Sequence, residues 1–293
     1  MKESGKHRRL GQKRFTPYLL LLPSILVFAV FTYYPFVRSI LLAFSVTDKQ
    51  GNFVKWVGFS NFMRLLQRSS FWQVISNTVA FALMVCIGTL IPACLLALIC
   101  IRERKGSRVY QTMYSITMSI ASVPASAMFL FILRKDGLLN RFFGTEIAWL
   151  QTTQTALSSV AGVTIWLGIG SSFLFLLVGF RNIPEELLES ALIDGAGPMR
   201  RIIHIIFPIA SPQMFFVLFL NITYSFKAFG QIKLLTRGGP AMASETLVYS
   251  IYKEAMLNGR FETACAYAII LFLIIFIVTR IQFLLEKKVV FYK

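Results

Sequence analysis

The chain has 293 residues, of which 56% are hydrophobic and only 15% are charged. Because soluble domains carry about 25% charged residues, a water-soluble fold would lack the polar surface to cover such a core. The net charge of +17 would suit a nucleic acid, but the Lys and Arg residues gather in short clusters beside long apolar runs. Such clusters are typical of the cytoplasmic loops of membrane proteins, so we expect a lipid bilayer, and no nucleic acid, as partner.

The chain begins with a basic segment, residues 1–17, and continues with six apolar runs that are each long enough to cross a bilayer. The runs are continuously apolar rather than alternating, so the sequence predicts an all-α integral membrane protein and not a β-barrel. The six predicted spans are residues 18–37, 74–101, 113–133, 157–180, 214–235 and 264–285.

The distribution of Lys and Arg predicts the orientation of these spans. With the basic start in the cytoplasm, six crossings return the tail, residues 286–293, to the same side. Residues 18–285 then form one membrane domain, which carries a cytoplasmic loop at residues 181–212. We therefore expect both termini of the protein to be cytoplasmic.

Two outer connections carry structure of their own. Residues 38–73 mix aromatic and basic residues in an amphipathic pattern, which predicts a helix lying on the outer membrane surface. Residues 237–262 begin with the turn signal TRGGP and continue as ETLVYSIYKEAM, a short amphipathic helix.

The sequence lacks the motifs of common catalytic and metal sites. It has no GxxxxGK[ST] loop for ATP phosphates, no HExxH and no GxSxG, and its two histidines lie far apart. Its four cysteines have no CxxC spacing, which favours buried free thiols over zinc. We predict no catalytic residue, no metal and no cofactor in this chain. The alternative from another class is a membrane-embedded enzyme that uses the loop carboxylates Glu185, Glu186, Glu189 and Asp194.

The cytoplasmic loop carries the signals of two short helices joined by a turn. Pro184 suits the first position of a helix, and two glutamates follow where the positive helix end favours acids. Gly195 is a natural left-handed cap, and Pro198 opens the second helix. We expect Pro208 and Pro212 to break the chain before the next span.

One face of the first loop helix combines Leu187, Ser190, Ala191 and Asp194, at positions i, i+3, i+4 and i+7. Two small residues on that face would let another backbone approach closely. From spacing alone, the favoured explanation is a short amphipathic helix that merely lies on the membrane.

The loop resembles the EAA loop of the permease subunits of ATP-binding-cassette (ABC) importers, whose pattern is Glu-Ala-Ala, x3, Gly, x9, Ile-x-Leu-Pro. Every interval matches, although Ser replaces the first Ala and Phe replaces the Leu. The longer string IPEELLESALIDGAGP is similar to the carbohydrate-type subgroup, which includes maltose, oligosaccharide and glycerol-3-phosphate permeases. The residues at the motif positions are Glu189, Ser190, Ala191, Gly195, Ile205, Phe207 and Pro208, of which Ser190 and Phe207 are the two replacements.

The resemblance extends over nearly the whole chain and implies the six-helix type I ABC importer permease fold in a bacterial inner membrane. It implies a second permease subunit, expected as a heterodimer, two ATPase subunits that bind ATP and Mg, and an external solute-binding protein. It also implies that the loop couples this chain to the ATPase. The residues assigned to that contact are Glu189, Ser190, Ala191, Asp194, Gly195, Ala196 and Pro208.

Polar residues inside spans are candidates for contact with the solute. In the fifth span, Asn221, Tyr224, Lys227 and Gln231 fall within an arc of roughly 120°. Lys227 would suit a phosphate, but lysine is common here in sugar permeases, and its side chain could also extend to the surface. A serine stripe in the third span is better explained by close helix packing.

The resemblance leaves two solute classes open, a sugar or oligosaccharide and a glycerol phosphate or related polyol phosphate. The sugar class is the broader one, so the sequence favours it. A passive channel is a third functional alternative.

Overall fold

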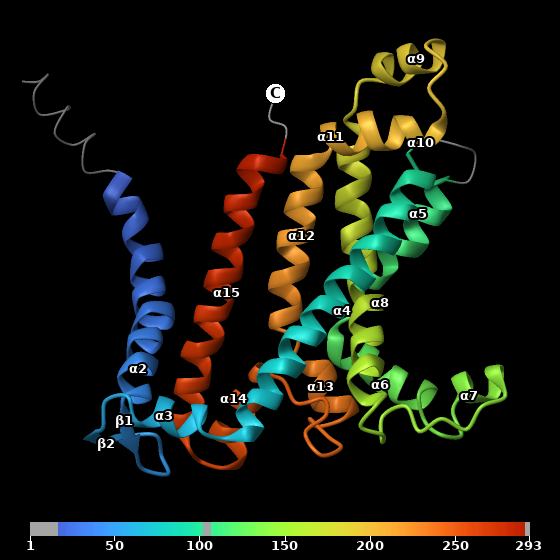
Figure 1. Cartoon of the computed structure of the whole chain (residues 1–293). Helices are drawn as coiled ribbons and strands as arrows, with labels where there is room; N and C mark the ends of the chain where they lie inside the picture. The colour runs from blue at the N-terminus through green and yellow to red at the C-terminus, as the bar shows by residue number, and fades with distance from the viewer. Residues whose placement is uncertain (1–16, 102–106, 291–293) are drawn as a thin grey trace, which may run out of the picture.

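Long helices dominate the computed structural model, which describes residues 17–101 and 107–290 (Figure 1). Within these residues, five helices are long and apolar enough to cross a membrane. They are Pro17–Ala43, Ser69–Ile99, Ala156–Arg181, Ser211–Leu235 and Phe261–Lys288. A sixth span results if a strongly bent helix pair counts as one.

The core of the bundle lies where α4 (Ser69–Ile99), α8 (Ala156–Arg181) and α12 (Ser211–Phe226) meet. Ala93 and Ala97 of α4 are fully buried beside Phe173 and Phe180 of α8. Small residues spaced by four let the two helix backbones approach closely, and the large rings of α8 fill the space beside them. This close packing makes α4 and α8 the central pair of the bundle.

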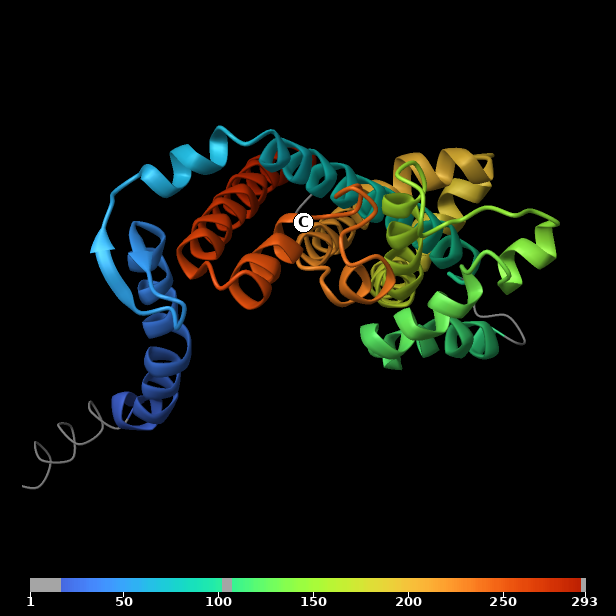
Figure 2. The same cartoon turned by 90° about the horizontal axis from the view of Figure 1, so that it is seen from below.

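The first helix stands apart from this core. It contains a π-helical turn, Ala29–Tyr33, followed by α2 (Tyr34–Ala43), and no residue of its most apolar window is buried. Near its lower end it contacts α15 (Phe261–Val289), where the ring centroids of Phe36 and Phe272 lie 5.7 Å apart. Figure 2 shows the first helix at the edge of the molecule, beyond α15.

The third predicted span is not one continuous helix but a bent pair of helices. The segments Gln111–Ser119 and Ser122–Ile132 (α6) are bent by 106°. The first contains most of α5 (Ser107–Ser115) and the 3₁₀ turn Ile116–Ser119. Pro124 lacks the amide hydrogen that an unbroken helix would donate to residue 120, and the backbone at 120–121 is extended instead. The predicted serine stripe is therefore divided between two directions.

The fifth span is also interrupted. Helix α12 ends at Phe226, residues 227–229 form a turn, and α13 (Gly230–Leu235) continues the segment. The amide of Lys227 donates to the carbonyl of Tyr224, a tightened bond that ends the regular helix.

The outer connections form small elements at one end of the bundle. Residues 38–73 contain the antiparallel hairpin β1 (Ser45–Thr47) and β2 (Phe53–Trp56), which the all-helical prediction missed, and then the expected helix, α3 (Ser60–Leu66). α7 (Leu138–Phe143) and the expected α14 (Leu247–Tyr252), extended by the π-helical turn Lys253–Leu257, lie at the same end (Figure 1).

The opposite end carries α9 (Glu185–Ile193), α10 (Pro198–Arg201), the π-helical turn Ile202–Ile206 and α11 (Phe207–Ile209). Both described chain ends also lie at this end (Figure 1). The predicted break at Pro208 is wrong, because helical structure continues to Ile209. The π-helical turn Ile202–Ile206 directly precedes α11, so Pro208 occupies a position where no amide hydrogen has to be donated. The break before α12 falls at Ala210.

Candidate functional site

The loop between α8 and α12 folds as two helices that meet at Gly195. This residue has φ of 74°, a left-handed conformation that glycine adopts without a steric penalty. The Gly195 amide donates to Leu192 O at 3.1 Å, and the Ala196 amide donates to Ala191 O at 2.9 Å. These bonds close the end of α9, as the sequence predicts.

The structure brings six of the seven predicted loop residues to this one turn. The side chains of Glu189, Ser190 and Asp194 are exposed there, and Ala196 is half-buried. Ala191 is only 9% exposed, so its methyl group packs inside the loop and is not presented to another protein. The seventh residue, Pro208, lies in α11 at the far end of the second helix.

Sequence reasoning missed the apolar side chains at the tip of the loop. Leu192, Ile193 and Met199 are 55%, 87% and 67% exposed. The exposed acids Glu189 and Asp194 belong to the same turn, so the tip combines exposed apolar and charged groups. Exposed apolar groups bordered by polar ones mark surfaces that another protein covers. Leu192 and Ile193 lie two to four residues beyond Ser190 and Glu189, and Met199 follows Pro198, but none of the three belongs to a motif of its own.

The loop is joined rigidly to the spans. Only residues 182–184 separate α8 from α9, and the Arg181 guanidinium donates to Cys100 O at 3.0 Å, which ties the ends of α8 and α4 together. A groove of about 850 Å³ lies behind α9, with Glu185 and Glu189 on its loop side and Arg201 from the second helix. Movement of α9 would therefore be transmitted directly to α8 and α4.

Inside the bundle, a cavity of about 520 Å³ lies between the bent third span, α8 and α12. Asn221, buried in its wall, donates to Ser172 Oγ at 2.9 Å and to Val217 O at 3.0 Å. Ser172 Oγ donates back to Asn221 Oδ1 at 3.3 Å. Sequence reasoning missed Ser172, whose partner is 49 residues away in the chain. The polar groups in this wall are Thr117, Ser122, Ser171, Ser172, Asn221 and Tyr224.

A second cavity of about 520 Å³ lies beside the turn at residues 227–229. Tyr224 lines both cavities, whereas Lys227 and Gln231 line only the second. Gln231 is buried and donates to Tyr224 Oη at 3.3 Å. The four predicted pathway residues thus line two adjoining cavities. They do not share one helical arc, because the turn at residues 227–229 interrupts the helix: two of them lie on α12, Lys227 lies in the turn, and Gln231 lies on α13.

The second of these cavities is lined by positive charge. Lys227 and Lys233 line the second cavity, and none of the described residues lining either cavity is Asp or Glu. The Lys233 ammonium lies 4.4 Å from the centroid of the Tyr252 ring, within the range of a cation–π contact. Lys227 is exposed and remains available to a ligand.

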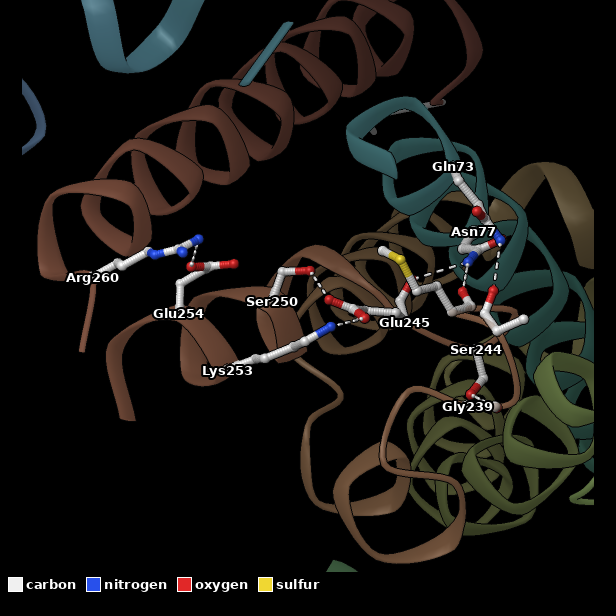
Figure 3. A network of polar contacts seen from close by, with 11 residues as sticks. Gln73, Asn77, Gly239, Ser244, Glu245, Ser250, Lys253, Glu254 and Arg260 are labelled. Atoms are coloured by element: carbon white, nitrogen blue, oxygen red, sulfur yellow. Dashed lines mark hydrogen bonds and ion pairs between the residues drawn. The ribbon is translucent and has the colours of Figure 1, made fainter. Parts of the chain in front are cut away.

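The end of the bundle opposite α9 holds a polar network that sequence reasoning missed (Figure 3). Glu245 is buried, and its carboxylate accepts hydrogen bonds from Ser250 Oγ at 2.7 Å and Lys253 Nζ at 2.8 Å. Asn77 of α4 donates to the carbonyls of Met242 and Glu245 at 2.8 and 3.1 Å. These contacts join segments 165–168 residues apart, so no local pattern could reveal them.

The same network holds a loop in an unfavourable conformation. Ala241 has φ of 45°, which is rare for a residue with a side chain. Its carbonyl accepts from Gln73 Nε2 at 3.3 Å, and Ser244 Oγ donates to Gly239 O at 2.7 Å. Burial raises the pKa of the nearby Tyr249, and the negative charge of Glu245 raises it further. The hydrogen bonds of Gln73 and Ser244 therefore hold this loop in a defined conformation.

Among residues 17–101 and 107–290, no group of three or more His, Cys, Asp or Glu side chains is placed to hold a metal ion. The loop carboxylates are exposed on α9 and at its end, and two of them, Glu185 and Glu189, line the groove behind α9.

Residues 93–291 match the family of binding-protein-dependent transport system inner membrane components. The chain belongs to this family. The resemblance to ABC importer permeases is thereby confirmed: the protein is a multi-pass inner-membrane permease subunit. It works with a partner permease, a separate ATPase subunit and a binding protein.

Two similar curated relatives are sn-glycerol-3-phosphate transport system permease proteins UgpA. The Escherichia coli protein (strain UTI89) is 30% identical over 288 residues, covering 96% of this permease and 98% of the relative. The Yersinia enterocolitica protein is 33% identical over 279 residues, covering 93% and 95%.

Two solved bacterial alginate ABC transporters contain chains of the same fold. One match has a TM-score of 0.85 at 21% identity and covers 97% of this permease and 99% of the other chain. The second, solved with an alginate pentasaccharide-bound periplasmic protein, has a TM-score of 0.82 at 23% identity, covering 94% and 96%. The type I permease fold predicted from the sequence is confirmed.

Proposed function

We propose that this permease forms half of the translocation pathway of an ATP-driven importer and is coupled to the ATPase through residues 181–212. The observation that carries the proposal is the exposed tip of the loop, with Ile193 87% exposed beside Glu189 and Asp194. Coupling requires a rigid element that another protein can grip. The short connection from α8 to α9 and the capped end at Gly195 supply that rigidity.

In this arrangement the loop end of the bundle faces the cytoplasm, with both termini. Two ATPase subunits bind ATP and Mg there, and the solute-binding protein meets the opposite end. A second, different permease completes the pathway. The almost fully exposed first helix supports an assembly of this kind, because it offers a long apolar surface to lipid and to a neighbouring subunit.

For the solute, we propose a glycerol-3-phosphate-like polyol phosphate. The UgpA relatives named for this solute cover nearly the whole chain. The cavities support the same choice, since Lys227 and Lys233 face a space lined by no acidic residue among those described. A neutral sugar is the second candidate, because the hydroxyl and amide groups around Asn221 and Ser172 suit sugar hydroxyls.

The complete importer, reconstituted in liposomes with its binding protein, tests the proposal. We expect ATP-dependent uptake of sn-glycerol-3-phosphate, and Lys227→Met to lower that uptake by about 10- to 100-fold, the effect of losing one charged hydrogen bond. Lys227→Arg should retain more activity. Uptake of a neutral oligosaccharide that Lys227→Met leaves unchanged would instead support the second candidate. Flux without ATP would indicate a channel, and chemistry by the purified chain alone would indicate an enzyme.

A further inference from the structure

The segment between the first helix and α4 forms a strap, residues 44–68, made of the hairpin β1–β2 and helix α3. It connects the ends of two spans that lie at the same level. It follows the outside of α15, as the view along the bundle shows (Figure 2). The strap therefore lies at the end of the bundle opposite α9 (Figure 1).

The strap is fixed to the bundle rather than free. The buried Asn61 side chain donates to Ala43 O and to Ser45 O, both at 2.8 Å. Thr47 is hydrogen-bonded to Glu262 at the start of α15. At the hairpin turn, the amide and side chain of Asn52 donate to Asp48, which lowers the pKa of that carboxyl. The outward face of the strap is consequently held in a defined orientation.

Helix α3 is apolar on two opposite faces. Leu65 is buried in the cluster that includes residues of α15. Phe59, Met63 and Leu66 follow the spacing i, i+4 and i+7 and are 69%, 64% and 48% exposed. A soluble surface helix would have polar groups on this second face. Some apolar environment outside this chain therefore covers it.

Aromatic and basic side chains border the exposed stripe. Trp56 and Trp72 are both more than half exposed, and Trp72 Nε1 donates to Leu66 O at 2.9 Å. Lys55, Arg64 and Arg68 are exposed on the same strap or at its end. Trp favours the level of the lipid headgroups, and Lys and Arg side chains can reach anionic phosphates while their stems lie on apolar surface.

We propose that the strap is an interfacial anchor that lies in the headgroup and upper acyl region of the leaflet opposite the loop end. A bilayer explains the stripe better than a protein partner for two reasons. Phe36 and Leu41 of α2, the helix that leads into the strap, also expose apolar side chains, and the exposed cations of the strap complement anionic headgroups. The anchor fixes the depth of α2 and α4 in the bilayer at the end where the strap lies. Movement of the loop at residues 181–212 then displaces the spans relative to that fixed depth.

Electron paramagnetic resonance of the complete importer in lipid nanodiscs tests the anchor. A nitroxide is attached at Met63→Cys after the four native cysteines are replaced, and its exposure to oxygen and to a water-soluble nickel chelate is compared. Gln50→Cys, on the exposed hairpin turn, is the matched control. We expect the label at 63 to favour oxygen over the chelate and the label at 50 to show the reverse order.

Two results would overturn the anchor. Equal access of the chelate to both labels would place the stripe in water. Loss of access to both reagents at residue 63 would show that another subunit covers α3. Phe59→Ser should shift the label at 63 toward the chelate, whereas Phe142→Ser, an exposed phenylalanine on α7, should leave it unchanged.

Discussion

The turn at Gly195 gives the sharpest prediction for the coupling loop. Its φ of 74° would cost any residue with a Cβ roughly 1–2 kcal/mol. No atom lies within 4 Å of the position that a Cβ would occupy, so Gly195→Ala introduces backbone strain without a clash inside the chain. A cost of this size reduces the population of the native turn by about 5- to 30-fold relative to other backbone conformations of the loop.

We therefore expect Gly195→Ala to lower the uptake of solute per ATP hydrolysed by up to about 30-fold. Membrane insertion and the amount of permease should stay normal. Gly195→Asn should be milder, because asparagine tolerates the left-handed region. The assay is solute uptake and ATP hydrolysis by the complete importer in liposomes, with the permease quantified by purification.

Gly197→Ala provides the control. Gly197 lies two residues away with an ordinary φ of −63°, and it too has open space around it. It should transport as the wild type does. Normal coupling in Gly195→Ala would refute the argument from the left-handed turn. An equal defect in both alanine variants would show that bulk at the tip, rather than backbone conformation, is what matters.

Two pairs of polar residues yield further predictions. Removing either partner of the Asn221–Ser172 hydrogen bond should lower the thermal stability of the permease. A double-mutant cycle should give a coupling energy of about 0.6 kcal/mol, the value typical of hydrogen bonds between helices in membranes. A coupling energy of zero would contradict the geometry. Lys253→Met leaves the Glu245 carboxylate buried without its charged partner, which should lower the stability of the folded permease by about 3 kcal/mol. The second substitution Glu245→Gln removes the buried charge and should restore most of that stability. A single Lys253→Met variant as stable as the wild type in a melting assay would contradict this.

The loop could be predicted in detail because its signals are local. The cap at Gly195 and the opening of the second helix at Pro198 depend on residues within a few positions of each other. The wide turn before Pro208 could not be predicted, because helices can absorb a proline by adjusting their hydrogen bonds in more than one way. Burial of Ala191 was hidden for another reason, since it depends on how the two loop helices fold together.

The spans were predicted by apolarity alone, which is sufficient to count crossings and insufficient to find their breaks. The bend at residues 120–121 lies inside a run that is predominantly apolar on both sides of it. The bond between Ser172 and Asn221 and the network around Glu245 depend on contacts between distant segments. The pathway residues were identifiable as polar groups in a span, but their division between two cavities required the turn at residues 227–229.

The most direct test of the account is the ratio of solute taken up to ATP hydrolysed in liposomes containing the complete importer with Glu189→Lys. Glu189 is exposed at the tip of the loop and lines the groove behind it. The account predicts normal amounts of inserted permease with hydrolysis no longer accompanied by uptake. A wild-type ratio and wild-type uptake at normal expression would contradict coupling through this loop.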